Sequence, residues 1–408
     1  MTINLKTTSL IATVLLTSLS GIVFASTNGH ANAPEIEATP IPLMYSEIPY
    51  LDKAFIDATP ANRKDGIPVG TLGLNGGNKK MILQFAQEIA DHKHGSYDSF
   101  LIAHKGKLLF ESYYNRGRVN LPHYQASATK SHTGLVLGRA IQLGYLTMED
   151  LDKPLLSFLK DLDSTKFADG VENITLNQAL TMQSGVRLSR EQKKALKKKP
   201  ARLKGQGLVQ AWFENTTPIT AESQRFKYGF GPEFVMQVIE AVVPGSAKDF
   251  IQKEFLEKMG ITHYRWLNNG ITGLPESGWR SSLTSRDMLK IGTLVMNNGQ
   301  WNGEQLIPAA FIDKASSRLL YTGDDDVHYG GQDVSNQGYG YFWWSADLKL
   351  GHQSYYSVSA QGGNGQLITL IEELDLIIVH TANDNDTAYL QKIAENILPA
   401  FVQPSINP

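Results

Sequence analysis

The spacing of apolar residues predicts the first regular elements of the chain. Apolar positions 81, 82, 85, 86 and 89 recur at helical spacing, which predicts one amphipathic helix ending at about Asp91. Residues 99–114 then form two apolar runs on either side of Lys105 and Gly106. A Gly-containing break between two such runs is typical of a β-hairpin. A helix followed by a hairpin therefore opens an α/β lobe.

Capping signals dominate the middle of the chain. Thr147 with Asp150, and Thr175 with Gln178, stand at or near the spacing of a capping box, so each pair predicts a helix start. Further on, a turn at Tyr228 leads into an apolar run that predicts another helix. Thr284 and Asp287 predict a further one, and they lie just before the second set of strand signals. We interpret this middle region as mainly helical.

Strand signals return near the end of the chain. Residues 339–344, 365–371 and 374–380 are predicted strands, and residues 387–401 a closing helix. We therefore expect an α/β (α+β) fold with one antiparallel sheet built from both ends of the chain, flanked by N- and C-terminal helices. The expected parts are an arm (26–75), an α/β lobe (76–120 and 285–408) and an inserted helical lobe (121–284). The site should lie in the crevice between the two lobes.

The first residues indicate export. Lys6 precedes a mostly apolar stretch, residues 10–24, and Ala25 offers a small residue at a cleavage point. These are the parts of a secretory signal peptide, here residues 1–25, and they predict a periplasmic or secreted protein. A retained N-terminal anchor is the alternative. The chain has no cysteine, which excludes a disulfide, a thiolate metal site and a cysteine-linked lipid.

Charge narrows the choice of partners. The formal net charge is −2, so nothing favours nucleic acid or an anionic membrane surface as a partner. A basic run occupies residues 193–204. We interpret it as a solvated surface segment, and the alternative is a cationic rim near the pocket that favours anionic substrates.

Candidate chemistry is concentrated at Ser127 and Lys130, three residues apart at a predicted helix start. Residues i and i+3 share one helix face, so the amine would lie beside the hydroxyl. A serine needs such a base to become a nucleophile, and a lysine can act as one only when burial or nearby charge lowers its pKa. The helix N-terminus adds backbone N–H groups for a developing oxyanion. The spacing alone is weak, because Ser157 and Lys160 repeat it.

Five segments in order make the chain resemble the serine β-lactamase-related hydrolases, which include class C β-lactamases, DD-peptidases, esterases and 6-aminohexanoate-oligomer hydrolases. Together they cover roughly residues 100–383. The matching segments are Ser127-Ala-Thr-Lys130, residues 174–185, Tyr228, residues 283–288, and Gln361-Gly-Gly-Asn-Gly-Gln366.

The resemblance implies a role for each matched residue. Ser127 would be the acylated nucleophile, and Lys130 and Tyr228 would share the proton transfers as coupled sites. The backbone N–H groups of Ser127 and Gly363 would form the oxyanion hole. The family uses no metal or organic cofactor, so none is expected.

Two departures from the family pattern bear on the substrate. The second motif of the β-lactamases and peptidases is Tyr-x-Asn, but Phe230 stands in the place of the asparagine. The third motif is Lys-Thr-Gly, and here the triplet is Ala360-Gln361-Gly362, without the lysine that helps to hold a substrate carboxylate. Phe230, Gln361 and Gly362 are then the expected substrate-binding positions. The sequence favours an esterase or amidase acting on a small ester, amide or short peptide-like molecule. The alternatives are a β-lactamase or DD-peptidase, and a non-catalytic binding or sensor protein.

Overall fold

The computed structural model describes residues 32–37, 45–322, 329–386 and 388–402. The described residues from 33 onwards form one compact unit. The expected signal peptide lies outside the described residues. Within the described ranges, no helix combines the length and the apolar character needed to cross a membrane.

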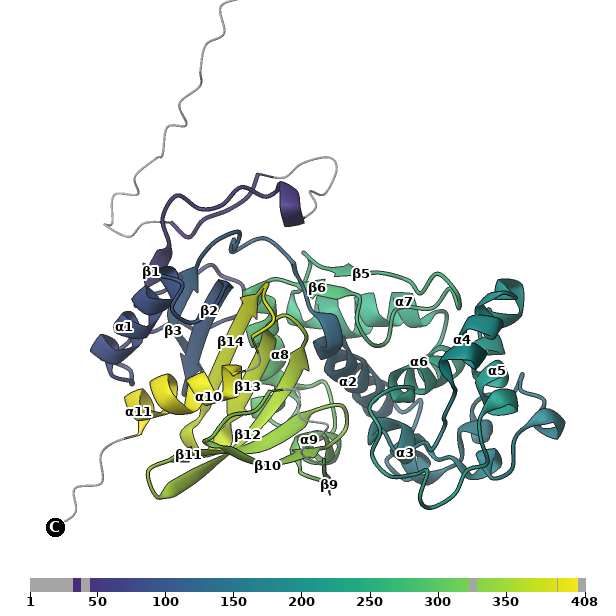
Figure 1. Cartoon of the computed structure of the whole chain (residues 1–408). Helices are drawn as coiled ribbons and strands as arrows, with labels where there is room; N and C mark the ends of the chain where they lie inside the picture. Colours follow the sequence, from purple (N-terminus) through teal and green to yellow (C-terminus); the bar gives the residue numbers. More distant parts are fainter. Residues whose placement is uncertain (1–31, 38–44, 323–328, 387, 403–408) are drawn as a thin grey trace, which may run out of the picture. The chain divides into compact units, whose positions relative to one another are not determined.

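A nine-stranded antiparallel sheet is the largest element of the fold (Figure 1). Both ends of the chain build it, as the sequence predicts, because β14 pairs with β2 across about 280 residues of chain. In spatial order the strands are β1 (Phe55–Asp57), β3 (Lys107–Tyr113), β2 (Tyr97–His104), β14 (Leu376–Ala382), β13 (Gln366–Ile371), β12 (Gln353–Gly362), β11 (Trp344–Leu350), β10 (Val334–Tyr339) and β9 (Leu320–Tyr321).

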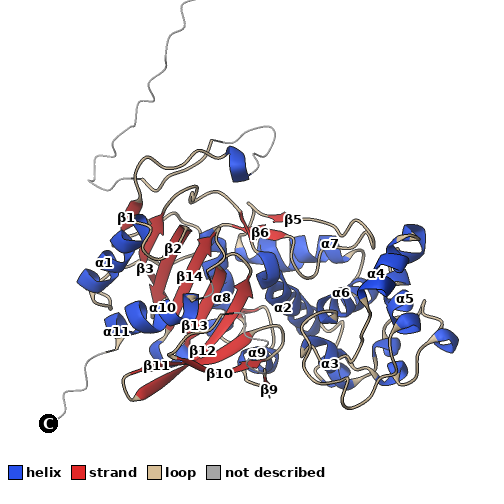
Figure 2. Cartoon of the chain, viewed as in Figure 1, coloured by secondary structure: helices blue, strands red, loops and turns tan. Residues whose placement is uncertain are grey.

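Alternate residues of the central strands pack on opposite faces of the sheet. In β2, Phe100 and Ile102 contact the cluster that includes α1 (Lys79–Ala90), α10 (Tyr389–Lys392) and α11 (Leu398–Phe401). Leu101 and Ala103 contact the cluster that includes α2 (Thr129–Gln142) and α8 (Ser285–Met296). Figure 2 shows this helix–sheet–helix layering. The predicted fold class is confirmed.

In the sequence, the remaining helices come after the N-terminal strands of the sheet and before its C-terminal strands. They pack beside α2, away from the nine-stranded sheet (Figure 1), while the predicted lobe boundaries at 121 and 284 stay predictions. These helices are α3 (Leu176–Leu180), α4 (Arg190–Lys197), α5 (Gly207–Asn215), α6 (Gly231–Val242) and α7 (Ala247–Phe250). Further along the chain, α9 (Ala309–Ser316) lies instead beside β9 and β10 of the sheet (Figure 1).

Two small sheets complete the described structure. The three-stranded one has the order β4 (His123–Tyr124), β6 (Ser281–Leu283), β5 (Arg265–Trp266) and borders the nucleophile segment. The other is the hairpin β7 (Gln300–Trp301) with β8 (Glu304–Gln305).

Three local predictions need correction. Residues 339–344 are not one strand, because β10 ends at Tyr339 and the chain turns through Phe342, which has a φ of +63°, before β11. The sequence predicts no strand between residues 26 and 75, but β1 lies there and pairs with β3 at the edge of the sheet. The Thr147–Asp150 cap is formed, but it starts only a single 3₁₀ turn, Glu149–Asp152.

Candidate active site

Ser127 lies in a short 3₁₀ turn, Ala126–Ala128, that runs directly into α2. Ala126, the residue before it, has a φ of +46°, in the left-handed region that alanine rarely adopts. Such backbone strain persists only where the surrounding structure enforces it, and it is common at functional sites. Ser127 itself is half-buried.

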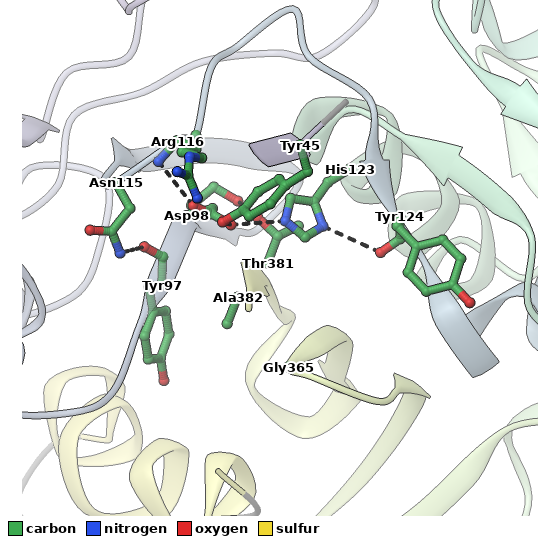
Figure 3. Close-up of polar contacts among 12 residues, drawn as sticks. Tyr45, Tyr97, Asp98, Asn115, Arg116, His123, Tyr124, Gly365, Thr381 and Ala382 are labelled. Atoms are coloured by element: carbon green, nitrogen blue, oxygen red, sulfur yellow. Dashed lines mark hydrogen bonds and ion pairs between the residues drawn. The ribbon is translucent and has the colours of Figure 1, made fainter. Parts of the chain in front are cut away.

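A buried polar cluster anchors the strand ahead of this turn (Figure 3). His123 Nε2 lies 2.9 Å from Oδ2 of Asp98, which is fully buried. The Tyr45 hydroxyl donates to the same oxygen at 2.7 Å. Because His123 faces inward, the next side chain, Tyr124, points away from this cluster (Figure 3). The cluster thus fixes β4 three residues before the serine.

Lys130 is the side chain that directly contacts Ser127. Its Nζ lies 3.0 Å from Ser127 Oγ and 2.8 Å from the carbonyl oxygen of Gly278. Lys130 is 9% exposed, and this burial lowers the pKa of its amine to about 7. A large fraction of the amine is therefore neutral near pH 7, which makes it able to accept a proton.

Tyr228 completes the cluster at the base of α6. Its ring lies under the Lys130 amine, with Nζ 4.6 Å from the ring centroid. Burial raises the pKa of Tyr228 to about 12, against the opposing effect of hydrogen bonding with Ser127 and Trp344. The hydroxyl is thus protonated at neutral pH and can donate a proton rather than remove one.

The end of β12 closes on the nucleophile turn. A Cβ added to Gly362 would lie 2.1 Å from the carbonyl oxygen of Gln125 and 3.2 Å from the backbone nitrogen of Ala128. Only a glycine permits this approach. It brings the following residue, Gly363, beside the turn that carries Ser127.

A loop before β6 holds the other side of Lys130. Thr133 Oγ1 donates to the carbonyl oxygen of Ser277 at 2.8 Å, and Thr129 Oγ1 lies 2.8 Å from Ser281 Oγ. Both threonines come from α2, so the loop is fixed to the nucleophile helix on either side of Gly278. The Gly278 carbonyl is consequently held where it orients the Lys130 amine.

Two cavities are lined by residues that precede or follow the nucleophile turn in the sequence. The first, which we name the Tyr228 cavity, has a volume of about 760 Å³ and lies on the Lys130 side. Its walls include Trp212, Phe230 and Trp279. The second, the Arg280 cavity, has a volume of about 740 Å³ and is bordered by Tyr124 and Asn364. Tyr124 lines the Arg280 cavity and Lys130 lines the Tyr228 cavity, so in the sequence the two cavities are reached on either side of Ser127, which itself lines neither.

The structure brings most of the predicted residues together. Phe230 lines the Tyr228 cavity and packs edge-on against Trp212, with ring centroids 4.7 Å apart. Gln361 is not at either cavity: it is 2% exposed, and its Nε2 donates to Ser359 Oγ on the opposite face of β12 from Ala360 and Gly362. Strand alternation turns this side chain away from the Gly362 face, and the expected substrate-binding role of Gln361 stays a prediction.

The second Ser-x-x-Lys segment lies elsewhere. Ser157 ends an isolated 3₁₀ turn, Leu155–Ser157, and Lys160 is exposed. Of the basic run 193–204, Lys193 reaches the Tyr228 cavity and places its Nζ 4.9 Å from the Phe230 ring centroid. No other member of the run lines either cavity within the described ranges.

Sequence reasoning missed two buried acids at the Tyr228 cavity. Glu233 and Glu276 are each 5–7% exposed. The pKa of Glu233 is raised to about 7, chiefly by burial; the hydrogen bond from Gln237 opposes this rise and the charge of Glu276 adds to it. The signal that could have revealed Glu233 is a charged residue in the first turn of a predicted helix, directly before the apolar residues 234–236. Trp279 and the Gly278 carbonyl were also missed, since they belong to a loop without periodicity.

Comparison with known proteins identifies the relatives of the chain. The beta-lactamase family model matches residues 84–400. No curated protein sequence matches. A Bacillus anthracis protein described provisionally as a 6-aminohexanoate-dimer hydrolase is 20% identical, with a TM-score of 0.58 over 84% of this chain and 88% of that one.

Two further solved structures share the fold. A Bacteroides dorei protein described provisionally as a beta-lactamase is 17% identical, with a TM-score of 0.60 over 80% of this chain and 99% of that one. EstCE1, a hydrolase with promiscuous acyltransferase activity, is 13% identical, with a TM-score of 0.59 over 78% of this chain and 97% of that one. At these identities the likeness establishes the fold alone.

Proposed function

Because the chain belongs to the beta-lactamase family of hydrolases, we propose that it is an exported serine hydrolase that forms an acyl-enzyme on Ser127 and acts on esters or amides. The observation that carries this proposal is the 3.0 Å contact between Lys130 Nζ and Ser127 Oγ, made by an amine whose pKa burial lowers to about 7. Export rests on the leader pattern of residues 1–25.

The proposed acylation follows from the positions of these groups. Neutral Lys130 accepts the Ser127 proton as Oγ bonds to the substrate carbonyl carbon. The negative charge on the carbonyl oxygen is stabilised by the backbone N–H groups of Ser127 and Gly363. The bond to the leaving group then breaks, and Tyr228 delivers a proton to the leaving oxygen or nitrogen while the protonated Lys130 replaces it. Water then attacks the acyl-enzyme by the same groups in reverse.

The walls of the site support an esterase or amidase over a β-lactamase or DD-peptidase. Phe230 offers an aromatic wall where a carboxamide would be needed, and Ala360 is fully buried in the apolar core on the α2 side of the sheet. No cation therefore stands at the third-motif position. The intact Ser127, Lys130 and Tyr228 cluster argues against a non-catalytic binding protein, which has no need of a nucleophile with its base.

A fluorophosphonate probe tests the acyl-enzyme proposal. The purified protein is expected to react with it and to carry the adduct on Ser127, because the probe reports serines that an adjacent base activates. Peptide mass spectrometry locates the adduct. An unlabelled protein, or an adduct on Ser157, would contradict the assignment.

Substrate preference gives a separate test. The kcat/KM for a neutral short-chain p-nitrophenyl ester is expected to exceed that for a chromogenic cephalosporin, measured on the same preparation. A β-lactam carries a carboxylate close to its reacting carbonyl, and an unpaired charge that loses water on binding costs several kcal/mol. The rate of Ser127→Ala provides the background for both substrates. A cephalosporin value equal to or above that of the ester would favour the β-lactamase alternative.

A further inference from the structure

One face of the three-stranded sheet β4–β6–β5 borders the Arg280 cavity, which His123 also reaches from the inner face of β4. Tyr124, Ser282 and Arg265 stand opposite one another across the three strands. All three line the cavity, as does Arg280, two residues before Ser282. Residues two apart in a strand share a face. Ser281 and Leu283, the residues on either side of Ser282 in β6, are buried.

The same alternation continues along β5. His263, Arg265 and Leu267 line the Arg280 cavity, while Tyr264 and Trp266 are turned inward and half-buried. The outer face of this small sheet therefore gathers two guanidinium groups and an imidazole at one cavity. Among the described residues, Glu37 is the acid that lines it.

Neither guanidinium has its charge neutralised by a close partner. In the described part of the chain, Arg265 and Arg280 form no ion pair and donate no side-chain hydrogen bond. Arg280 stacks on the Trp279 ring at 4.7 Å. Burial raises the pKa of Glu276, which lines the other cavity, and the positive charge of Arg280 opposes that rise. The two side chains form no hydrogen bond or ion pair in the described part of the chain. A planar guanidinium fork with free donors matches a carboxylate.

Two residues that line the Arg280 cavity are close in the sequence to the residues proposed for catalysis. Tyr124 is three residues before Ser127, and Asn364 directly follows Gly363. A substrate whose carbonyl lies at Ser127 can thus extend part of its length over Tyr124 towards the arginines. Arg265 stands two inter-strand spacings from Tyr124, about 10 Å. A carboxylate bound there is many bonds from the scissile carbonyl, unlike that of a β-lactam.

We propose that the Arg280 cavity is an anion subsite, in which Arg265 and Arg280 bind a carboxylate that the substrate carries at a distance from the bond that is cleaved. This inference rests on the proposed serine hydrolase and narrows its substrate class. This chain lacks the family's third-motif lysine, and in the proposal Arg265 and Arg280 supply the positive charge for a substrate carboxylate at the Arg280 cavity instead.

Paired substrates test the subsite. In one pair the acyl chain of a p-nitrophenyl ester ends in a carboxylate or in its methyl ester, and the chain spans about two inter-strand spacings. In the other pair the leaving group is 4-hydroxybenzoate or its methyl ester. The protein is expected to prefer the carboxylate member of one pair by about tenfold in kcat/KM, equivalent to about 1.4 kcal/mol. The ratio should fall with added salt, which screens exposed charges.

The variants are Arg265→Gln, Arg280→Gln and both together, with Arg190→Gln in the first turn of α4 as the matched control outside both cavities. The double variant is expected to reduce the ratio to about one, and the control to retain it. A ratio of two rates on one sample is independent of the amount of folded protein.

Each outcome is decisive. A wild-type ratio near one for both pairs, or a tenfold ratio that survives in the double variant, would overturn the subsite while leaving the hydrolase in place. Inhibition by inorganic phosphate that Arg280→Gln relieves, without any preference within the pairs, would show that the cavity binds free anions and is not part of substrate recognition. If no member of either pair is hydrolysed, the proposed function and the subsite both fail.

Discussion

Ser127→Ala is expected to reduce ester hydrolysis by roughly four orders of magnitude or more, because the acyl-enzyme can no longer form. Removing one hydroxyl from a half-buried position leaves Lys130 its second contact, the Gly278 carbonyl, so we expect the fold to persist. Initial rates with a p-nitrophenyl ester measure the loss, and circular dichroism checks the fold.

Ser157→Ala is the matched control, because Ser157 begins the second Ser-x-x-Lys segment and the lysine of that segment, Lys160, is exposed. It should retain turnover close to that of the wild type. Full activity in Ser127→Ala would show that Ser127 is not the nucleophile. A large loss of activity in Ser157→Ala would make Ser157 the candidate nucleophile instead.

The proton carriers are expected to give the next largest effects. Lys130→Ala and Tyr228→Phe should each slow acylation by about two to four orders of magnitude, the usual range for general acid–base groups. The double variant should lose far less than the sum of the two effects, because the groups act on the same proton transfers. Single-turnover measurements on esters and amides give the acylation rates. Normal turnover of both substrate types by Tyr228→Phe would reduce Tyr228 to a packing role.

The pH profile of kcat/KM distinguishes the two groups. Below its pKa of about 7, the Lys130 amine is protonated and cannot accept the serine proton, so activity should rise with pH through about 7 and then level off. A phenol with a pKa of about 12 cannot produce this rise. The rise should therefore persist in Tyr228→Phe and disappear in Lys130→Ala. The reverse result would assign the base to Tyr228.

Local patterns explain what the sequence predicted well. The β2–β3 hairpin carries its own turn at Lys105 and Gly106, and α1 carries a complete apolar stripe. The motif residues Ser127 and Lys130 are one helical turn apart, so their contact depends on little beyond the local helix. Each of these features is encoded within a stretch of roughly 11–18 residues or fewer, which is the window over which hydrophobic periodicity is informative.

The features that the sequence analysis did not predict depend on contacts between segments that are distant in the chain. Strand β1 has only three residues, and it is a strand because β3 offers it an edge. The side chain of Gln361 belongs to the opposite face of β12, a matter of register that a motif match does not resolve. The Gly278 carbonyl oxygen that contacts Lys130 belongs to the backbone, so no pattern of side chains could predict this contact. The Arg265 and Arg280 pair appears only when β5 and β6 are placed side by side.

The position of β14 in the sheet determines when folding can finish. The N-terminal strands β1, β3 and β2 form one end of the sheet, and the inner edge of β2 is covered only by β14, which ends at Ala382. Every residue of β2 is buried in the native protein, so a ribosome-bound or truncated chain that lacks β14 exposes a long apolar edge. Pairings over such sequence separations form slowly and leave intermediates prone to aggregation. Removal of the last strand should therefore yield insoluble protein, and recovery of soluble enzyme will depend on folding of the complete chain after synthesis.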